Sequence, residues 1–231
     1  MKLVFEFRKT GDLIYLSHLD LSRLFLRVLR MSGLKPAYSQ GFNPHPKMSF
    51  ALPLSLGLHS ICELLEFETE RFLPHEDTET AVRIVNERLP EGARVTAWHE
   101  KPQRIPKSLA SYAAAATYEF MCDRIEDAPA LLSAFFARES IVVKRPDKKT
   151  GEAMDREIRA EMLGCAIVKD IRGRMLAEAT LSAAPGSTLN PTVFFHAFCT
   201  ASGIEAGALS PVITRTAILG NDGRPLTEIL L

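Results

Sequence analysis

Short strands and amphipathic helices follow one another twice along the 231 residues, in almost the same order each time. In the first half, alternation of apolar residues predicts strands and helical periodicity predicts helices, at 2–9, 17–33, 37–51, 61–69, 74–89 and 93–98. Their order, β-α-β-β-α-β, is that of a ferredoxin-like split βαβ unit. Residues 117–219 repeat this order with an extra strand or bulge. We therefore expect an α+β fold of two tandem ferredoxin-like halves with antiparallel sheets.

A proline-containing stretch between the two halves marks the expected domain boundary. Residues 102–108 hold two prolines and few large apolar side chains, which is typical of a linker. The sequence thus predicts an N-terminal domain at 1–101, a linker at 102–116 and a C-terminal domain at 117–231.

Local signals mark the ends of two helices. Ser17 followed by Asp20 has the spacing of a capping box, and Gly33 is a natural helix stop. In the second half, Asn190 is a good N-cap and Pro191 suits the first helical position.

Composition excludes several classes of protein. Lysine and arginine balance aspartate and glutamate at 28 each, so the net charge points to no partner. An apolar run of ~18 residues is missing, and Glu6 and Arg8 interrupt the N-terminus too early for a signal peptide, so we expect a cytoplasmic protein without membrane contact. The four cysteines are scattered without a C-x-x-C pair, which predicts no metal site and no cofactor.

Positive charge is concentrated near the N-terminus. Residues 1–60 hold eight basic and three acidic side chains, a balance of 8 − 3 = +5. Arg23, Arg27 and Arg30 follow a spacing of i, i+4 and i+7, so they share one face of the first helix. Such clustering is typical of phosphate-backbone binding, although a solvated helix face would look the same.

The segment 37–50 is the least ordinary part of the chain. It combines glycine, two prolines, a histidine and a lysine in one stiff polar loop, a common kind of binding site. Tyr38 or Phe42 could stack on a base, or Phe42 and Phe50 could instead fill the core. His18, at the start of the first helix, is a candidate general base or phosphate contact, or simply a structural residue. Farther along, Lys144, Arg145, Lys148 and Lys149 are expected at an exposed hairpin tip.

Two long motifs carry a resemblance to a known family. The sequences TGDLIYLSHLD at 10–20 and AYSQGFNPHPK at 37–47, followed by ALPL at 51–54, resemble the bacterial radical-SAM-associated domain family of unknown function. The resemblance covers nearly the whole chain and weakens after about residue 110. Some members are fused behind a radical-SAM enzyme domain, so the resemblance implies a standalone form that works with a separate radical-SAM protein.

A fainter resemblance concerns CRISPR-type RNA-processing proteins with tandem ferredoxin-like domains. It rests on the expected architecture and on Tyr38, His45 and Lys47 after the first helix. Those proteins end in a glycine-rich loop, and only residues 219–223 are similar here.

The leading hypothesis is an RNA-binding accessory module that presents tRNA or rRNA to a radical-SAM modifying enzyme. Phosphates are expected at Arg23, Arg27, Arg30 and Lys47, and bases or 2′-hydroxyls at Tyr38, Gln40, Asn43 and His45. The second face of the first strand, with Val4, Glu6 and Arg8, lacks stacking aromatics, so RNA is expected at the helix-and-loop edge.

Two alternatives remain open. One is a metal-independent endoribonuclease with His18 or His45 as general base and Lys47 stabilising the charged intermediate. The other is a protein–protein adaptor for a radical-SAM partner. The RNA hypothesis requires the three arginines and the 41–47 turn to share one open cationic surface.

Overall fold

The computed structural model describes every residue except 147–150, 172, 206 and 208, and it has the α+β fold that the sequence predicts. The chain forms two compact units: unit 1 contains Met1–Ala113 and Arg215–Leu231, and unit 2 contains Ala114–Thr214. This division differs from the predicted boundaries, because the last 17 residues (215–231) and most of the expected linker belong to unit 1. The predicted tandem of two ferredoxin-like halves is not confirmed.

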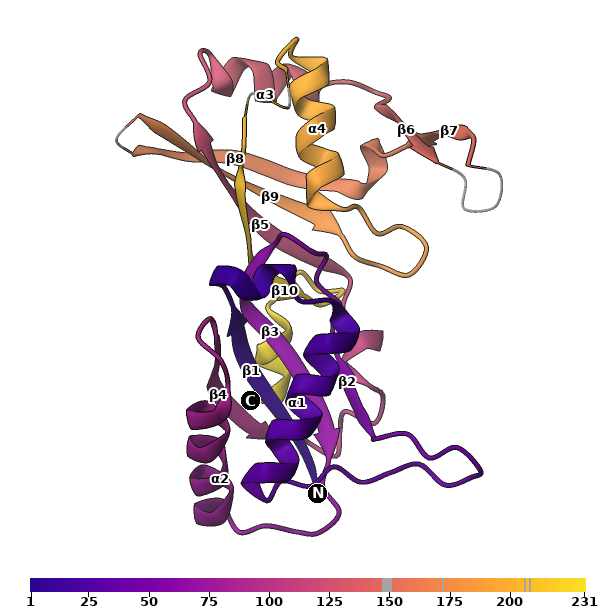
Figure 1. Ribbon diagram of the computed structural model, residues 1–231. Helices are drawn as coiled ribbons and strands as arrows, with labels where there is room; N and C mark the ends of the chain where they lie inside the picture. Colours follow the sequence, from indigo (N-terminus) through magenta and orange to yellow (C-terminus); the bar gives the residue numbers. More distant parts are fainter. Residues whose placement is uncertain (147–150, 172, 206, 208) are drawn as a thin grey trace. The chain divides into compact units, whose positions relative to one another are not determined.

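Unit 1 is built on an antiparallel sheet (Figure 1). Its elements in chain order are β1 (Lys2–Lys9), η1 (Gly11–Tyr15), α1 (His18–Ser32), β2 (Met48–Phe50), β3 (His59–Glu68), α2 (His75–Arg88), β4 (Ala93–Glu100), η2 (Leu109–Ser111), the end of β10 (Val212–Leu219) and η5 (Leu226–Leu230). β1 pairs antiparallel with β4 on one side and with β3 on the other, and β2 pairs antiparallel with β3. β10 also lies beside β3.

Both ends of α1 follow the signals in the sequence. The Ser17 hydroxyl accepts a hydrogen bond from the Asp20 amide at 3.1 Å, and Gly33 closes the helix at φ 91°. The apolar stripe of α1 packs with α2 on one face of the sheet, where Phe7 and Phe25 rings lie 4.6 Å apart. The predicted capping of α1 is therefore confirmed.

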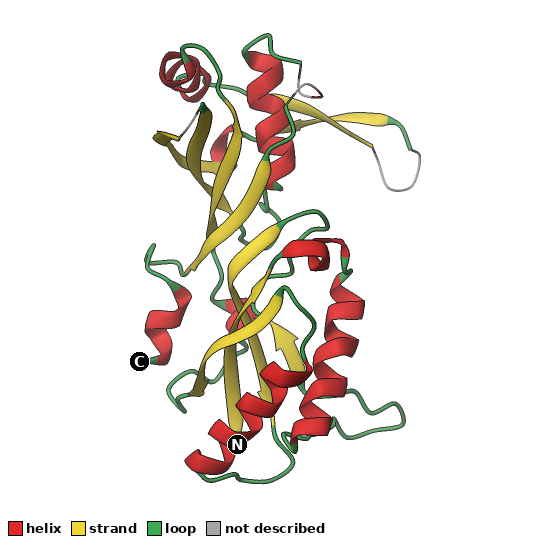
Figure 2. Ribbon diagram, turned by 60° about the vertical axis from the view of Figure 1, so that its left-hand side comes forward, coloured by secondary structure: helices red, strands yellow, loops and turns green. Residues whose placement is uncertain are grey.

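The opposite face of this sheet is also covered. Figure 2 shows the C-terminal helix η5 on this face, on the side away from α1 and α2. Val4 is fully buried there against Leu109 and Leu226. Val4 therefore does not lie on a solvent-exposed face of β1. The expected linker supplies part of this cover: the Glu66 carboxylate accepts hydrogen bonds from the Lys101 amine at 2.7 Å and the Leu109 amide at 2.8 Å.

Unit 2 has a smaller antiparallel sheet with β9 between β5 and β8. Its elements are β5 (Ala115–Asp123), α3 (Ala128–Phe136), β6 (Val142–Pro146), β7 (Ala153–Glu157), η3 (Arg159–Glu161), β8 (Met162–Ile171), β9 (Arg174–Ser182), α4 (Pro191–Ala201) and the start of β10. Phenylalanine rings of α3, α4 and β5 form its core. α4 begins as predicted, since the Asn190 side chain accepts a hydrogen bond from the Thr192 amide at 2.8 Å.

A separate two-stranded hairpin, β6–β7, interrupts unit 2. A break separates its second strand from the sheet, because β7 ends at Glu157 and β8 begins at Met162. The Glu157 carboxylate explains the break, because it accepts hydrogen bonds from the backbone amides of Ile158 and Arg159. Lys144 and Arg145 lie on the hairpin, whereas the predicted tip residues Lys148 and Lys149 fall outside the described residues.

None of the described helices is long and apolar enough to cross a bilayer.

Candidate nucleic-acid interface

A narrow hairpin-like loop, residues 37–47, extends from the edge of unit 1 (Figure 1). Backbone hydrogen bonds close its base, from the Ala37 amide to the Glu68 carbonyl and from the Lys47 amide to the Ala37 carbonyl, each 2.7 Å long. Farther out, the Ser39 amide donates to the His45 carbonyl at 2.8 Å, and the His45 amide donates to the Ser39 hydroxyl at 2.9 Å. These bonds hold a tip at 40–44 that is exposed throughout.

One contact joins the loop to the basic face of α1. The Arg30 guanidinium donates a hydrogen bond to the Tyr38 hydroxyl and lies 5.6 Å from the centroid of the same ring. A guanidinium over an aromatic face gains from the ring quadrupole, so helix and loop hold each other in place. The structure therefore brings two of the predicted site residues together.

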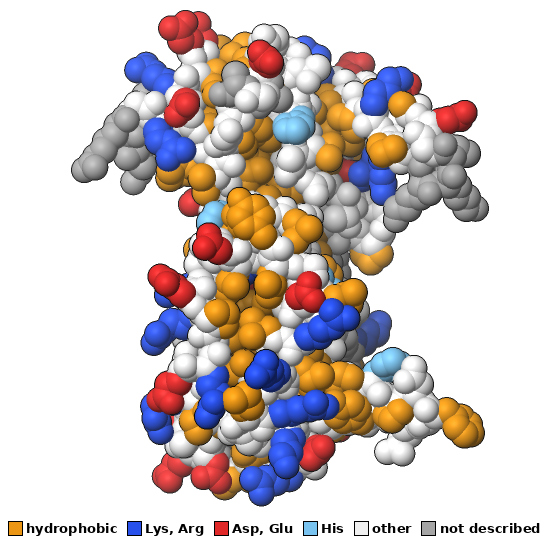
Figure 3. All heavy atoms as spheres, viewed as in Figure 1, with side chains coloured by type: hydrophobic (Ala, Val, Ile, Leu, Met, Phe, Trp, Pro, Cys, Tyr) orange, Lys and Arg blue, Asp and Glu red, His pale blue; other side chains and the backbone are white. Residues whose placement is uncertain are grey.

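The other predicted cations differ in whether a carboxylate pairs with them. Arg23 pairs with Asp20 at 2.9 Å, and Lys47 pairs with Glu68 at 3.1 Å, in both cases near solvent. Arg27 is exposed, and no carboxylate among the described residues pairs with it. The ion pairs reduce the positive charge that Arg23 and Lys47 contribute to the expected open cationic surface. Lysine and arginine side chains still gather over α1 in Figure 3.

The loop tip presents an aromatic side chain to solvent. Phe42 is fully exposed, whereas Phe50 is buried in the core beside Phe7 and Phe25. The alternative in which both phenylalanines fill the core is thus wrong for Phe42. Gln40, Asn43 and His45 are exposed near the same tip. The polar, proline-containing sequence around Phe42 is compatible with this exposure but did not decide it in advance.

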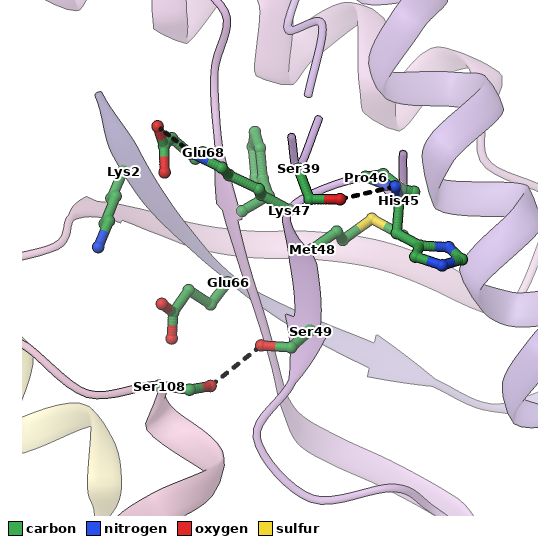
Figure 4. A pocket seen from close by; sticks show the side chains of 11 residues that line it. Lys2, Ser39, His45, Pro46, Lys47, Met48, Ser49, Glu66, Glu68 and Ser108 are labelled. Carbon is green, nitrogen blue, oxygen red and sulfur yellow. Dashed lines mark hydrogen bonds and ion pairs between the residues drawn. The ribbon is translucent and has the colours of Figure 1, made fainter. Parts of the chain in front are cut away.

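A hollow of about 350 Å³ lies at the foot of the loop (Figure 4). Its lining combines charged, hydroxyl and apolar side chains, among them Lys2, His45, Lys47, Met48, Ser49, Glu66 and Ser108. The Ser49 and Ser108 hydroxyls are 3.1 Å apart, and the Lys47 amine is directed toward Glu68. Ser49, Glu66 and Ser108 are residues that the sequence did not single out, because they come from segments far apart in the chain.

His18 is placed differently from the loop residues. Its ring packs edge-on against Phe50, with the centroids 5.2 Å apart, at the first position of α1. Among the described residues, no hydrogen bond connects the His18 or His45 ring to another side chain. The endoribonuclease hypothesis, with Lys47 already paired to Glu68, stays a prediction that this geometry does not strengthen.

The four cysteine thiols lose their protons less readily than a free cysteine does, because burial raises their pKa values. Burial raises the pKa of Cys62 and of Cys199 to about 11, and that of Cys165 to about 12. Within the part of the chain that the structure describes, no three His, Cys, Asp or Glu side chains lie close enough to hold a metal ion.

The fold and this edge define a class: an α+β protein whose N-terminal unit carries a basic helix joined to a stiff, aromatic-tipped loop. The chain belongs to the family described as "uncharacterized protein conserved in bacteria (DUF2344)", whose model matches residues 2–191.

Among solved structures, a chain in the crystal structure of a Cbf5-Nop10-Gar1 complex has a similar fold, with a TM-score of 0.53 and 9% sequence identity. The similarity covers 94% of this chain and 48% of the other, so this chain spans about half the length of the one it matches. At this identity the likeness concerns the fold alone. A comparison with curated proteins gives no match.

Proposed function

We propose that this protein is an RNA-binding accessory module that uses the edge formed by α1 and the 37–47 loop. The Arg30–Tyr38 contact carries the proposal, because it turns a helix face and a loop into one surface with a fixed geometry. A preorganised surface loses less entropy when a ligand binds than a flexible loop does.

The side chains on this surface suit two parts of a nucleotide. Arg27 and Arg30 are exposed cations for phosphates, and Phe42 offers a free ring face for a base. Aromatic stacking tolerates any base, and it is the usual mode for unstacked RNA loops and ends. His45, Gln40 and Asn43 add hydrogen-bonding groups near the tip.

Arg23 and Lys47 have secondary roles in this proposal. Each is in an exposed ion pair, and such pairs contribute only about 0–1 kcal/mol, so a phosphate can compete with the carboxylate. Asp20 and Glu68 nevertheless lower the local positive potential. We therefore assign the larger share of phosphate binding to Arg27 and Arg30.

The RNA is tRNA or rRNA, and a radical-SAM protein is the enzyme that the module serves. This part of the proposal is supported by the resemblance of residues 10–20 and 37–47 to the radical-SAM-associated domain family. A module that binds RNA and leaves the chemistry to a partner also agrees with the weak case for an acid–base pair at His18 or His45.

Binding of fluorescently labelled bulk tRNA, followed by anisotropy between 50 and 200 mM salt, tests the proposal. We expect affinity to fall with a log–log slope of about −0.7 to −0.9 per phosphate contact. Arg27→Glu is expected to weaken binding and flatten the slope. Arg83→Glu on α2 is the control, since Arg83 is an exposed arginine paired with Glu87 on another helix. A flat salt dependence, or equal loss in both variants, would reject RNA binding at this edge.

The fully exposed Phe42 also favours a second candidate, the protein–protein adaptor. A lone aromatic at the tip of a stiff loop is a common anchor in protein interfaces. The variant Phe42→Ala separates the two functions: if it abolishes co-purification with a radical-SAM protein while tRNA binding is unchanged, the adaptor function is the correct one.

A further inference from the structure

A second hollow, of about 610 Å³, lies within unit 2 between helix α4 and strand β6. It is lined on one side by α4 and on the other by β6 and the residues before it; Figure 2 shows both elements in unit 2. No residue of β7 lines it, although β7 is the hydrogen-bonded partner of β6. The hollow therefore faces the edge of β6 that β7 leaves free.

The α4 side of this groove is a single stripe. Val193, His196, Ala197 and Thr200 line it at i, i+3, i+4 and i+7, which places them on one face of the helix. His196 and Thr200 are exposed, Val193 is half-buried and Ala197 is buried. The stripe spans about 10 Å, roughly the length of three residues of an extended peptide.

On the β6 side, alternate backbone groups point away from β7 and have no partner among the described residues. The Ile158 amide donates to the Ile141 carbonyl at 2.9 Å, and Val142 lies opposite Glu157 while Lys144 lies opposite Asp155. In an antiparallel pair, residues alternate between those bonded to the partner strand and those whose backbone groups point away from it. The N–H and C=O groups of Val142 and Lys144 thus point to the free edge.

The described lining of the groove carries positive charge at Arg138 and Lys144. Its ionisable lining residues are Arg138, Lys144 and His196, and none of the described lining residues is acidic. Arg138 donates to the Ala201 carbonyl at 3.0 Å, which places its guanidinium at the C-terminal end of α4. Lys144 pairs with Asp155, but both side chains are largely exposed to solvent.

We propose that the groove between β6 and α4 binds an extended acidic peptide, which adds to the free edge of β6 as a third strand. Backbone hydrogen bonds to Val142 and Lys144 would hold the peptide, and its apolar side chains would contact Val142, Val193 and Ala197. Its carboxylates would meet Arg138, Lys144 and His196. The two-stranded hairpin would gain a third strand, the usual minimum for an independently stable sheet.

A nucleic acid fits this groove less well. Six of the eleven described lining residues are apolar, and no phenylalanine, tyrosine or tryptophan is among them to stack on bases. A strand edge with donors and acceptors in alternation matches a peptide backbone, whereas a phosphate chain offers acceptors only.

Selection of a phage-displayed library of random eight-residue peptides on the full chain tests this inference. We expect enriched peptides that alternate valine or isoleucine with aspartate or glutamate. Labelled synthetic copies are then titrated by anisotropy against three variants. Val142→Pro removes an N–H that points to the free edge without removing a hydrogen bond to β7. Lys144→Glu and His196→Glu place a negative charge in the groove, which repels the carboxylates of the peptide. Each variant is expected to weaken binding at least about tenfold, or about 1.4 kcal/mol.

Arg145→Glu is the matched control, because Arg145 is exposed on the same strand but does not line the groove. Binding to this variant is expected to stay within about twofold of the unmodified chain. Failure to enrich any peptide, enrichment of basic peptides, or equal affinities for Lys144→Glu, His196→Glu and Arg145→Glu would overturn the proposal. Tighter binding of oligo(U) RNA than of the enriched peptides, lost in Lys144→Glu, would assign the groove to nucleic acid instead.

Discussion

Arg215 on β10 and Glu63 on β3, which are 152 residues apart in sequence, form a fully buried ion pair inside unit 1. The Arg215 Nε donates to Glu63 Oε1 at 3.0 Å, and its Nη2 donates both to that oxygen and, at 2.7 Å, to the Leu52 carbonyl. The pair thereby connects the C-terminal segment to the central strand of a sheet formed by the N-terminal residues.

We expect Glu63→Ala to destabilise unit 1 by about 3–5 kcal/mol, because it removes the carboxylate that pairs with the buried Arg215 guanidinium. Urea unfolding followed by fluorescence measures this directly, since the only tryptophan of the chain, Trp98, lies on β4 of unit 1.

The double variant Glu63→Leu, Arg215→Met is the control for this explanation. Replacing a buried pair by apolar residues of similar volume is often neutral or stabilising. The double variant should therefore be more stable than Glu63→Ala. A double variant that loses as much stability as Glu63→Ala would contradict the assignment of the loss to an uncompensated charge.

This pair also explains why the compact units differ from the predicted domain boundaries. Alternation at 213–219 was sufficient to predict β10, because that pattern is local. Which sheet a strand joins depends on partners elsewhere, and the side chain of Arg215 gives no local sign that it will be buried against Glu63. The expected linker shows the same limit, since two prolines indicated a loop while its anchor, Glu66, comes from β3.

The candidate site was predictable where it depends on spacing and unpredictable where it depends on distant strands. The shared face of Arg23, Arg27 and Arg30 follows from helical periodicity, and so does the Arg23–Asp20 pair at i, i+3. Glu68 beside Lys47 could not be foreseen, because it depends on the pairing of β2 with β3. The sequence indicated a stiff loop but did not decide between an exposed and a buried Phe42.

The Glu157 carboxylate gives unit 2 a specific pH dependence. Hydrogen bonds from the Ser140 hydroxyl and from backbone amides of Arg159, Ile141 and Ile158 lower its pKa from 4.5 to about 2. A carboxyl whose pKa is depressed by folding stabilises the fold above its unfolded pKa, and the contribution disappears as pH falls through the folded pKa.

Glu157→Gln is therefore expected to lower the stability of unit 2 at pH 7, and the difference from the unmodified chain should vanish between about pH 4.5 and pH 2. Hydrogen exchange at the Ile141 and Ile158 amides, measured across this range, reports on the hairpin itself. Glu139→Gln, at an exposed position just before β6, is the control. Equal exchange in both variants at pH 7 would show that the carboxylate does not hold the hairpin.

Phe42→Ala separates binding from folding. Since the ring is fully exposed, we expect the urea midpoint to stay unchanged. If the ring stacks on a base, its loss costs about 1–3 kcal/mol, and the Kd for tRNA should rise about 5- to 150-fold. Phe72→Ala removes another exposed phenylalanine of unit 1, which lies outside the loop, and should leave the Kd unchanged. Equal effects of the two substitutions would remove the stacking role.

Substitution of Gly92, just before β4, measures how much its close packing against Thr10, just after β1, contributes to stability. Its φ is +92°, and a Cβ at this position would lie 2.3 Å from the Thr10 carbonyl oxygen. Gly33 has nearly the same φ, +91°, but open space around the missing Cβ. Both Gly→Ala variants incur the left-handed penalty of about 1–2 kcal/mol, whereas only Gly92→Ala also has to displace backbone, for about 1–3 kcal/mol more. The Thr10 amide would then lose its 2.8 Å hydrogen bond to the Gly92 carbonyl. Urea unfolding of the two variants, followed at Trp98, should therefore show the larger loss of unfolding free energy for Gly92→Ala. Equal losses would mean that the backbone at Thr10 moves away from the added Cβ at no energetic cost.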